Sequence, residues 1–404
     1  MIVNLKEQHC ENFLQSLHKE QWQEVRLGEI TSIIGDGLHG TPNFDVNGEC
    51  FFINGNNLND GQIIIKKDTK KVSSIECAKY KKDINEKTIL ISINGTLGNM
   101  ALYRGENIML GKSACYLNFK DNASRNFMRY VIINSDFQRY LNISATGTTI
   151  LNVPLKAIRD FTFLLPPLTI QQKIAEILSS FDDKIDLLHR QNKTLESLAL
   201  TLFRHYFIDN PKRDEWEEKP LSEIAEIGIG RTPPRKERHW FSTDSRDIKW
   251  ISIKDMEEKI FIVNTSEFLT MEAIRKFRIP LIPPNTILLS FKMTLGRVSI
   301  TTENMLSNEA IAHFNLYSEY RLFTEYLYCF LKTFKYETLG STSSIVTAIN
   351  STLIKSINIR IPDRKIIVEF SMIAKGFFDK IYNNTKQIQN LQAMRDMMLG
   401  KIFN

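Results

Sequence analysis

The segment Gly105–Ser113 is the part of this sequence that comes closest to a catalytic motif. It reads Gly-Glu-Asn-Ile-Met-Leu-Gly-Lys-Ser and nearly matches a P-loop, in which backbone amides and a lysine hold nucleotide phosphates. Five residues separate its glycines where the motif has four, and Ser113 leads into the strand-like run ACYLNF instead of a helix whose N-terminus could hold phosphate. We therefore predict no nucleotide site here.

Other catalytic patterns are missing as well. The proline pairs Pro233-Pro234 and Pro283-Pro284 lack the Asn/Asp-Pro-Pro-aromatic order of adenine methyltransferases. The seven histidines form no His-Glu-x-x-His zinc motif, and the sequence contains no Gly-x-Ser-x-Gly nucleophile elbow. Asp182-Asp183 is a pair of carboxylates, but it lies in a heptad-patterned segment and is expected on a solvated helix face. We expect this chain to be no enzyme and to carry neither a metal site nor a cofactor.

Two loops hold residues that suit DNA binding. In Gly35–Pro42, glycines accompany His39 and Thr41, so backbone amides and short polar groups can approach a phosphate or a base edge. The loop Gly228–Trp240 carries the cations Arg231, Arg235, Lys236 and Arg238. An arginine can bind guanine bidentately. Each loop alone would be interpreted as a surface turn, but because they recur at equivalent positions of the chain, DNA binding is favoured.

These loops recur because the sequence contains an internal repeat. Trp22 with LGEI returns 194 residues later as Trp216 with LSEI, and ILISINGTLG at Ile89–Gly98 returns 198 residues later as ILLSFKMTLG. MLGKSA returns as MLSNEA and FDDKI as FFDKI, both 196 residues later. Four matches in the same order at a nearly constant offset indicate two copies of one unit.

Each copy divides into a β-rich front and a helical tail. Short apolar runs broken by Gly, Asn and Asp predict a mixed α/β front domain, and prolines lead into each tail. We predict mixed α/β domains at residues 1–165 and 209–361, a central helix at 166–208 and a C-terminal helix at 362–404.

Both tails carry a heptad stripe. In the first tail the stripe is Phe181, Ile185, Leu188, Asn192, Leu195, Ala199, Leu202 and Tyr206; in the second it is Phe377, Ile381, Asn384, Ile388, Leu391, Arg395, Met398 and Ile402. A period of 3.5 residues sustained over nearly four heptads predicts that the tails form a coiled coil. The alternative is two separate amphipathic helices, each packed on its own domain.

The two stripe asparagines predict how the tails pair. Two copies of one unit are most simply related by a pseudo-twofold axis, which makes the helices antiparallel. A buried amide is costly unless a polar group pairs with it, so Asn192 is expected opposite Asn384. This register makes nearly every other layer apolar and sets Arg395 against Phe181. The alternative is that both asparagines face solvent.

Composition adds further expectations. The net charge of +6 and the pI near 8.9 favour a polyanionic partner. We expect a cytoplasmic protein, because the sequence shows neither a signal peptide nor an apolar run long enough to span a membrane. Five scattered cysteines predict neither a disulfide framework nor a zinc site: Cys10, Cys50, Cys77, Cys115 and Cys329.

Over nearly its whole length the chain resembles the specificity subunits of type I restriction-modification enzymes. The resemblance rests on the repeated architecture and on the opening WxxxxLGEI-like stretch, the loop Asp36–Pro42, its counterpart Gly230–Arg235, the two SxxxTLG segments, and LLPPLTIQQKIAEIL at Leu164–Leu178. The second tail departs from the family's Pro-Pro-Leu-x-x-Gln pattern at Arg360–Ala374.

The resemblance implies two target-recognition domains, spaced by an antiparallel coiled coil, that read a bipartite target in double-stranded DNA. It also implies partner subunits. Modification subunits, expected to be two, would bind S-adenosylmethionine and methylate adenine, and restriction subunits would use ATP and Mg²⁺. The alternative outside DNA binding is a coiled-coil scaffold that organises a protein complex.

Loop residues with polar or cationic side chains are the DNA-contact candidates. In the first domain they are His39, Thr41, Asn54, Asn56, Asn57, Lys112, Thr148 and Thr149, and in the second they are Arg231, Thr232, Arg235, Lys236, Lys254, Lys292, Ser341 and Thr342. For the asparagines the alternative role is turn formation, and for the lysines it is a solvated surface.

Overall fold

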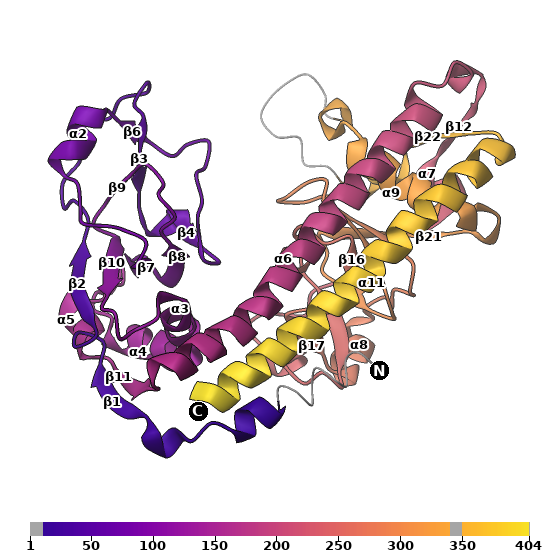
Figure 1. The fold of residues 1–404 in the computed structure, drawn as a ribbon. Coiled ribbons are helices and arrows are strands. Elements are labelled where there is room, and N and C mark those ends of the chain that lie inside the picture. Colours follow the sequence, from indigo (N-terminus) through magenta and orange to yellow (C-terminus); the bar gives the residue numbers. More distant parts are fainter. Residues whose placement is uncertain (1–10, 340–349, 404) are drawn as a thin grey trace. The chain divides into compact units, whose positions relative to one another are not determined.

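A computed structural model describes residues 11–339 and 350–403 of the chain. The chain forms two compact units, Met1–Asp183 with Leu391–Asn404, and Lys184–Asn390. Both units combine a β-rich domain with a stretch of each of two long helices (Figure 1).

The first unit is built on an antiparallel four-stranded sheet. Its order is β2 (Thr31–Asp36), β10 (Ala114–Phe119), β7 (Thr88–Asn94), β8 (Thr96–Leu102). Every residue of β10 is buried, and so is all of β7 except Asn94, as expected for apolar strands covered on both faces. Helices α3 (Arg125–Ile133) and α4 (Ser135–Ser144) pack against β8.

Smaller elements complete this unit. They are the pair β1 (Gln23–Arg26) and β11 (Thr162–Leu165), the sheet β6 (Lys71–Val72), β3 (Cys50–Ile53), β9 (Ile108–Leu110), the hairpin β4 (Leu58–Asn59) and β5 (Gln62–Ile63), and helices α2 (Ser74–Lys79) and α5 (Leu155–Asp160). Asp60 and Gly61 turn the hairpin with φ of 45° and 78°, the left-handed backbone that an Asp-Gly hairpin turn requires.

Cys50 and Cys77 form a disulfide in this unit. The cysteine spacing predicted no disulfide framework, and that expectation is wrong at this pair. The two residues are 27 positions apart, and strand β3 and helix α2 bring them together, so no short motif signals the bond. Cys115 and Cys329 are buried free thiols.

The second unit repeats the plan. Its main sheet has the order β13 (Ala225–Ile229), β21 (Ile311–Leu316), β18 (Ile287–Ser290), β19 (Val298–Thr301), β16 (Phe261–Ile262), so the first four strands follow the same order as β2, β10, β7 and β8. The other elements are β12 (Glu217–Pro220) paired with β22 (Asn358–Ile361), the sheet β14 (Phe241–Ser242), β17 (Glu267–Leu269), β15 (Ile248–Ile251), β20 (Leu306–Ser307), and helices α7 (Leu221–Ile224), α8 (Met271–Phe277), α9 (Thr324–Thr333) and α10 (Ser351–Lys355). This shared order confirms the tandem mixed α/β architecture.

The two long helices are α6 (Leu168–Phe203) and α11 (Arg364–Phe403). Among the predicted interface residues, the buried ones are Phe181, Ile185, Leu188, Ala199, Ile381, Asn384, Ile388, Leu391 and Met398, and the half-buried ones are Asn192, Leu195 and Phe377. Toward the domain core the buried stripe shifts by one residue: Phe203, Phe207 and Phe378 are buried in place of Leu202, Tyr206 and Phe377. A straight helix of 3.6 residues per turn drifts from a heptad repeat toward later residues, which accounts for the shift to Phe203. The segment after it, Arg204–Ile208, is π-helical.

The helices are antiparallel, in the register that the asparagines predict. The Asn384 Nδ2 donates to Asn192 Oδ1 at 2.9 Å, and the Phe203 and Phe207 rings, further along α6, meet Phe370, further back on α11. Asn384 is only 1% exposed, so the alternative of two solvent-facing asparagines is wrong for this residue.

The expected solvated role of Asp182 is also wrong. Its carboxylate accepts hydrogen bonds from Arg129 Nη2 at 2.5 Å, Tyr130 Oη at 2.7 Å and Arg395 Nη1 at 2.9 Å. Arg395 therefore ends in an ion pair with Asp182, whereas the sequence placed it against the Phe181 ring.

Candidate nucleic-acid interface

In the first unit the loop residues collect at one end of the four-stranded sheet. Strands β2 and β7 end there and β10 and β8 begin there, because Asp36 pairs with Cys115, Ser92 with Ala114 and Asn94 with Thr96. The loops at this end hold His39 and Thr41 after β2, Lys112 before β10, and Thr148 and Thr149 in the segment that Asn152 joins to Asn94, all five exposed. The structure therefore brings most of the first-domain candidates to one edge.

Close backbone packing positions the loop after β2. A Cβ on Gly37 would lie 2.1 Å from the Leu110 carbonyl oxygen, so only glycine fits there. The Leu38 amide donates to the same carbonyl at 2.7 Å. His39 Nε2 lies 2.7 Å from Asp36 Oδ2, and the histidine side chain is 73% exposed. The imidazole is therefore held through its distal nitrogen, and most of its surface is exposed to solvent.

The asparagines divide between two roles. Asn57 is 5% exposed, and its Nδ2 donates to Ile64 O at 3.0 Å and to Thr69 Oγ1 at 3.2 Å. This burial contradicts the prediction that Asn57 contacts DNA, and the turn-forming alternative describes it. The half-buried Asn54 accepts a hydrogen bond from Ser113 Oγ at 2.9 Å, while Asn56 is exposed.

The P-loop-like segment has a structural explanation. Ser113 Oγ also accepts from the Gly55 amide at 2.9 Å, so it ties the end of the segment to Asn54 and Gly55. Residues before it form β9 and those after it form β10, with Lys112 exposed in the turn. The segment therefore joins two strands, with no helix N-terminus behind it.

The segment that carries Thr148 and Thr149 projects from the same edge. Thr146 and Asn152 close it with mutual backbone hydrogen bonds of 2.8 Å, and Asn152 Oδ1 accepts from Asn94 Nδ2 at 3.2 Å. Ile150, at the tip, is 61% exposed. Sequence analysis missed this apolar residue, although its place beside the two threonines was the available signal.

The second unit builds the corresponding edge. Ile229 pairs with Ala312 and Ser290 with Ile311, so the loops after β13 and β18 emerge together. A Cβ on Gly230 would lie 2.2 Å from Asn308 O, the same close approach as at Gly37. Exposed residues at this edge include Arg231, Lys254 and Lys292. Met293, 99% exposed, was missed by sequence analysis despite lying in the repeated SFKMTLG segment.

Arg235 is the most constrained cation of this unit. Its guanidinium lies over the Phe241 ring at 4.4 Å and the Trp250 ring at 4.6 Å. Nη1 donates to both carboxylate oxygens of Glu267, at 2.7 and 2.9 Å. Arginine stacks well on aromatic faces, so the group is held in one orientation with half of its side-chain surface exposed.

Some of the remaining candidate side chains of the second domain are hydrogen-bonded within the chain, and others are exposed. Arg231 Nη1 donates to Phe277 O at 3.1 Å, and Thr232 Oγ1 donates to Glu309. Lys236 is exposed. Ser341 and Thr342 lie outside the described residues. The DNA-contact residues other than Asn57 thus stay predictions.

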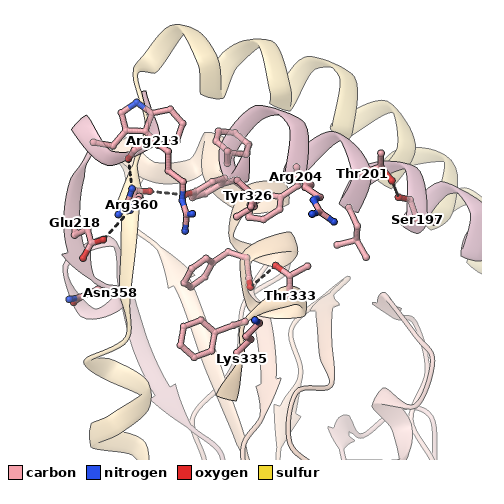
Figure 2. A pocket seen from close by; sticks show the side chains of 17 residues that line it. Ser197, Thr201, Arg204, Arg213, Glu218, Tyr326, Thr333, Lys335, Asn358 and Arg360 are labelled. Carbon is pink, nitrogen blue, oxygen red and sulfur yellow. Dashed lines mark hydrogen bonds and ion pairs between the residues drawn. The ribbon is translucent and has the colours of Figure 1, made fainter. Parts of the chain in front are cut away.

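A second surface of interest lies at the end of α6 in the second unit (Figure 2). A groove of about 890 Å³ is lined by α6, α9, the β12–β22 pair and the connection between α6 and β12. Its wall is aromatic, with Phe203, Phe207, Trp216, Tyr326, Phe330 and Phe334. Its charged residues are Arg204, Arg213, Lys335, Arg360 and Glu218.

One donor in this groove is unsatisfied. Trp216 is 9% exposed, and among the described residues its indole Nε1 has no hydrogen-bond partner. Arg360, in contrast, is held by Asp214 at 2.5 Å and Glu218 at 3.0 Å. Buried polar groups are nearly always paired, so this buried and unpaired indole N–H is an exception among the described residues.

No group of His, Cys, Asp or Glu side chains within residues 11–339 and 350–403 is arranged to hold a metal ion. None of the helices in this part of the chain has the length and apolar character of a membrane-spanning segment.

Comparison with known proteins defines the class. The model of the type I restriction modification DNA specificity domain matches the chain twice, at residues 19–197 and 213–393. The chain therefore belongs to the family of type I restriction-modification DNA specificity subunits. As a member of this family it is a non-catalytic subunit, in agreement with the sequence prediction.

Individual relatives agree with this assignment. The type I restriction enzyme MjaIX specificity subunit of Methanocaldococcus jannaschii is 25% identical over 342 residues, which cover 78% of this chain and 76% of the relative. The HindI specificity subunit of Haemophilus influenzae is 22% identical over 355 residues, with 69% and 76% covered. The crystal structure of the S subunit from M. genitalium matches the fold with a TM-score of 0.55 at 17% identity, covering 95% of this chain and 96% of the other.

Proposed function

We propose that this chain reads a bipartite sequence in double-stranded DNA, one half with each target-recognition domain. The observation that carries the proposal is the duplicated edge: in both units, loops with exposed cationic and polar side chains emerge from the same end of equivalent sheets. Family membership supplies the class of activity, DNA specificity.

Each edge combines two kinds of contact. Exposed lysines such as Lys112, Lys254 and Lys292 would neutralise phosphates and supply salt-dependent affinity. Groups held in a fixed orientation are better suited to base edges, because a bidentate contact discriminates only when its donors are pre-positioned. His39 and Arg235 are the best held of the exposed candidates. Ile150 and Met293 would contact thymine methyl groups.

The chemistry belongs to partners in this proposal. Modification subunits, two per chain, bind S-adenosylmethionine and methylate adenine, and restriction subunits use ATP and Mg²⁺. The assembly works on DNA in the cytoplasm. This chain supplies sequence selection and a docking surface.

The groove beside Trp216 is our candidate docking surface for the modification subunit. Its aromatic wall suits aliphatic or aromatic side chains, and its four cations against one carboxylate suit an acidic segment. Arg213 and Lys335 would meet its carboxylates, since Arg204 and Arg360 already form ion pairs within the chain.

Methylome sequencing tests the main proposal. Cells that lack other adenine methylation would express this chain with its modification partner. We expect a split motif, with methylated adenine and an unspecified spacer. Methylation at a single continuous motif, or none with a folded complex, would contradict bipartite reading.

Co-purification tests the docking surface. Arg213→Glu and Lys335→Glu reverse two groove charges, Trp216→Phe removes only the donor, and Lys380→Glu is a control at an exposed position of α11 outside the groove. We expect the charge reversals to reduce the retained modification subunit about tenfold, equivalent to about 1.4 kcal/mol of binding. Equal retention by all four variants would exclude the groove.

A further inference from the structure

Asp182 joins three elements of the first unit. It lies on α6, and its partners are Arg129 and Tyr130 on α3 and Arg395 on α11. The side chains of Asp182, Arg129 and Arg395 are 18%, 21% and 25% exposed. The recognition domain is thus attached to α6 by charge-assisted hydrogen bonds in a largely dry site.

A tyrosine of the second unit makes the corresponding attachment. Tyr328, on α9, donates to Glu196 Oε1 on α6 at 2.7 Å, and Lys332 Nζ lies 3.0 Å from the same oxygen. Tyr130 and Tyr328 are 198 residues apart, the same offset as between Ile89 and Ile287 of the repeat, and both are fully buried. Burial, more than the neighbouring carboxylate, raises the pKa of both hydroxyls well above their usual range, so both remain protonated donors.

The acceptor does not follow the repeat. The residue equivalent to Asp182 is Phe378, on α11, and its ring meets the Tyr328 ring edge-on at 5.1 Å. Glu196, from α6, provides the carboxylate instead. The tyrosine of each recognition domain therefore donates its hydrogen bond to a residue of α6. An exact repeat would have placed the second acceptor on α11.

Such attachments hold position in a way that apolar contacts do not. Aliphatic side chains gain nearly the same energy after a small slide or rotation, because the hydrophobic effect is non-directional. A hydrogen bond to a charged, largely buried carboxylate loses its energy when the geometry changes, and the unpaired charge is then costly.

We infer that Asp182 and Glu196 are positioning residues that fix the spacer length accepted between the two DNA half-sites. Both lie on α6, a single helix from Leu168 to Phe203, and are separated by fourteen positions of its sequence. Backbone hydrogen bonds of the helix set the rise per residue, so each attachment defines one position along its sequence. The inference rests on the proposed bipartite reading.

The test measures methylation by the reconstituted complex on DNA that carries both half-sites at the cognate spacer or at one base pair more or less. The variants are Asp182→Asn, Tyr130→Phe, Glu196→Gln and Tyr328→Phe. We expect methylation at the two wrong spacers to rise about tenfold relative to the cognate spacer, the ratio that about 1.4 kcal/mol represents. The bases that are read should stay the same.

Asp183→Asn and Lys193→Gln are matched controls at exposed positions of α6. Unchanged spacer discrimination in folded Tyr130→Phe and Tyr328→Phe overturns the inference, since these changes remove one oxygen and keep the ring packing. Thermal unfolding of each variant separates loose spacing from a damaged fold. If the wild-type complex methylates no split site, the proposed function fails instead.

Discussion

Asn384 donates a hydrogen bond to Asn192 at 2.9 Å and so joins α11 to α6 through a pair of amides. The heptad stripes of the two helices are otherwise apolar here, with Leu188 of α6 and Ile381 and Ile388 of α11 all buried in the second unit. An amide pair among apolar residues costs stability relative to a leucine pair but penalises every other register, because a shifted helix leaves both amides unpaired.

Replacing Asn384 with leucine should lower the free energy of unfolding by about 1–3 kcal/mol, because the Asn192 amide loses its partner. Replacing both asparagines with leucine should recover most of this loss. Chemical denaturation followed by circular dichroism measures both effects. Asn383→Leu, at an exposed position, is the control and should change stability by less than about 0.5 kcal/mol. If the double variant is less stable than either single variant, the hydrogen bond between the two asparagines does not explain the loss.

His313 should make the second unit sensitive to acid. Burial lowers the pKa of His313 to about 4 from its ordinary 6.5, and Ser307 Oγ lies 2.6 Å from its Nε2. Between pH 6.5 and pH 4 the histidine is protonated in the unfolded chain but remains neutral in the folded chain. The free energy of unfolding is therefore highest above pH 6.5 and falls as the pH drops toward 4.

The loss for this one group is on the order of 3 kcal/mol. Urea denaturation between pH 7 and pH 4 should show a shallower decline for His313→Gln than for the wild-type chain. His189→Gln, at an exposed position of α6, should leave the decline unchanged. Parallel curves for wild type and His313→Gln would show that His313 does not carry this effect.

Exchange of the first recognition domain should alter one half-site only. Replacing residues 20–165 with those of a relative changes the loops at one edge and leaves the second unit intact. Each domain alone offers few base contacts, and tethering raises the effective concentration of the second, so binding requires both. Methylome sequencing of the hybrid gives the result, and a change in both halves would show that the domains do not read independently.

Lengthening both helices should lengthen the spacer. A helix from about Gln171 to Phe207 is on the order of 55 Å long, which predicts half-sites roughly one to one and a half DNA turns apart. One added heptad in each helix contributes about 10 Å, or roughly three base pairs. The methylated motif should keep its bases and gain spacer, and an unchanged spacer in an active variant would refute the idea.

The features that could be predicted from the sequence are those with a local or repeated signal. The duplication appears as four matched segments, and the helix register follows from one asparagine per stripe, because only one alignment pairs them. Gly37 and Gly230 lie in loops that the repeat singled out, and each is required by close backbone approach.

Other features depend on residues far apart in the chain. Asp182 looked solvated because its partners Arg129 and Arg395 lie 53 and 213 residues away, beyond any helical period. Asn57 looked available because a sequence does not reveal which turn residue is directed inward. The groove beside Trp216 is formed by four separate segments of the chain, so no local sequence motif predicts it.

The composition of the first unit has a consequence for how new specificities arise. Its fold includes Leu391–Asn404 as well as Met1–Asp183, and Arg395 from that distant stretch completes the Asp182 cluster. A recombination event that imports only the upstream coding region therefore inherits an ion-pair partner from the recipient gene. An imported region that spans Met1–Asp183 should keep this cluster when it carries a carboxylate at position 182. The match between position 182 and the recipient's Arg395 is thus one chemical condition on exchange of this part of the gene.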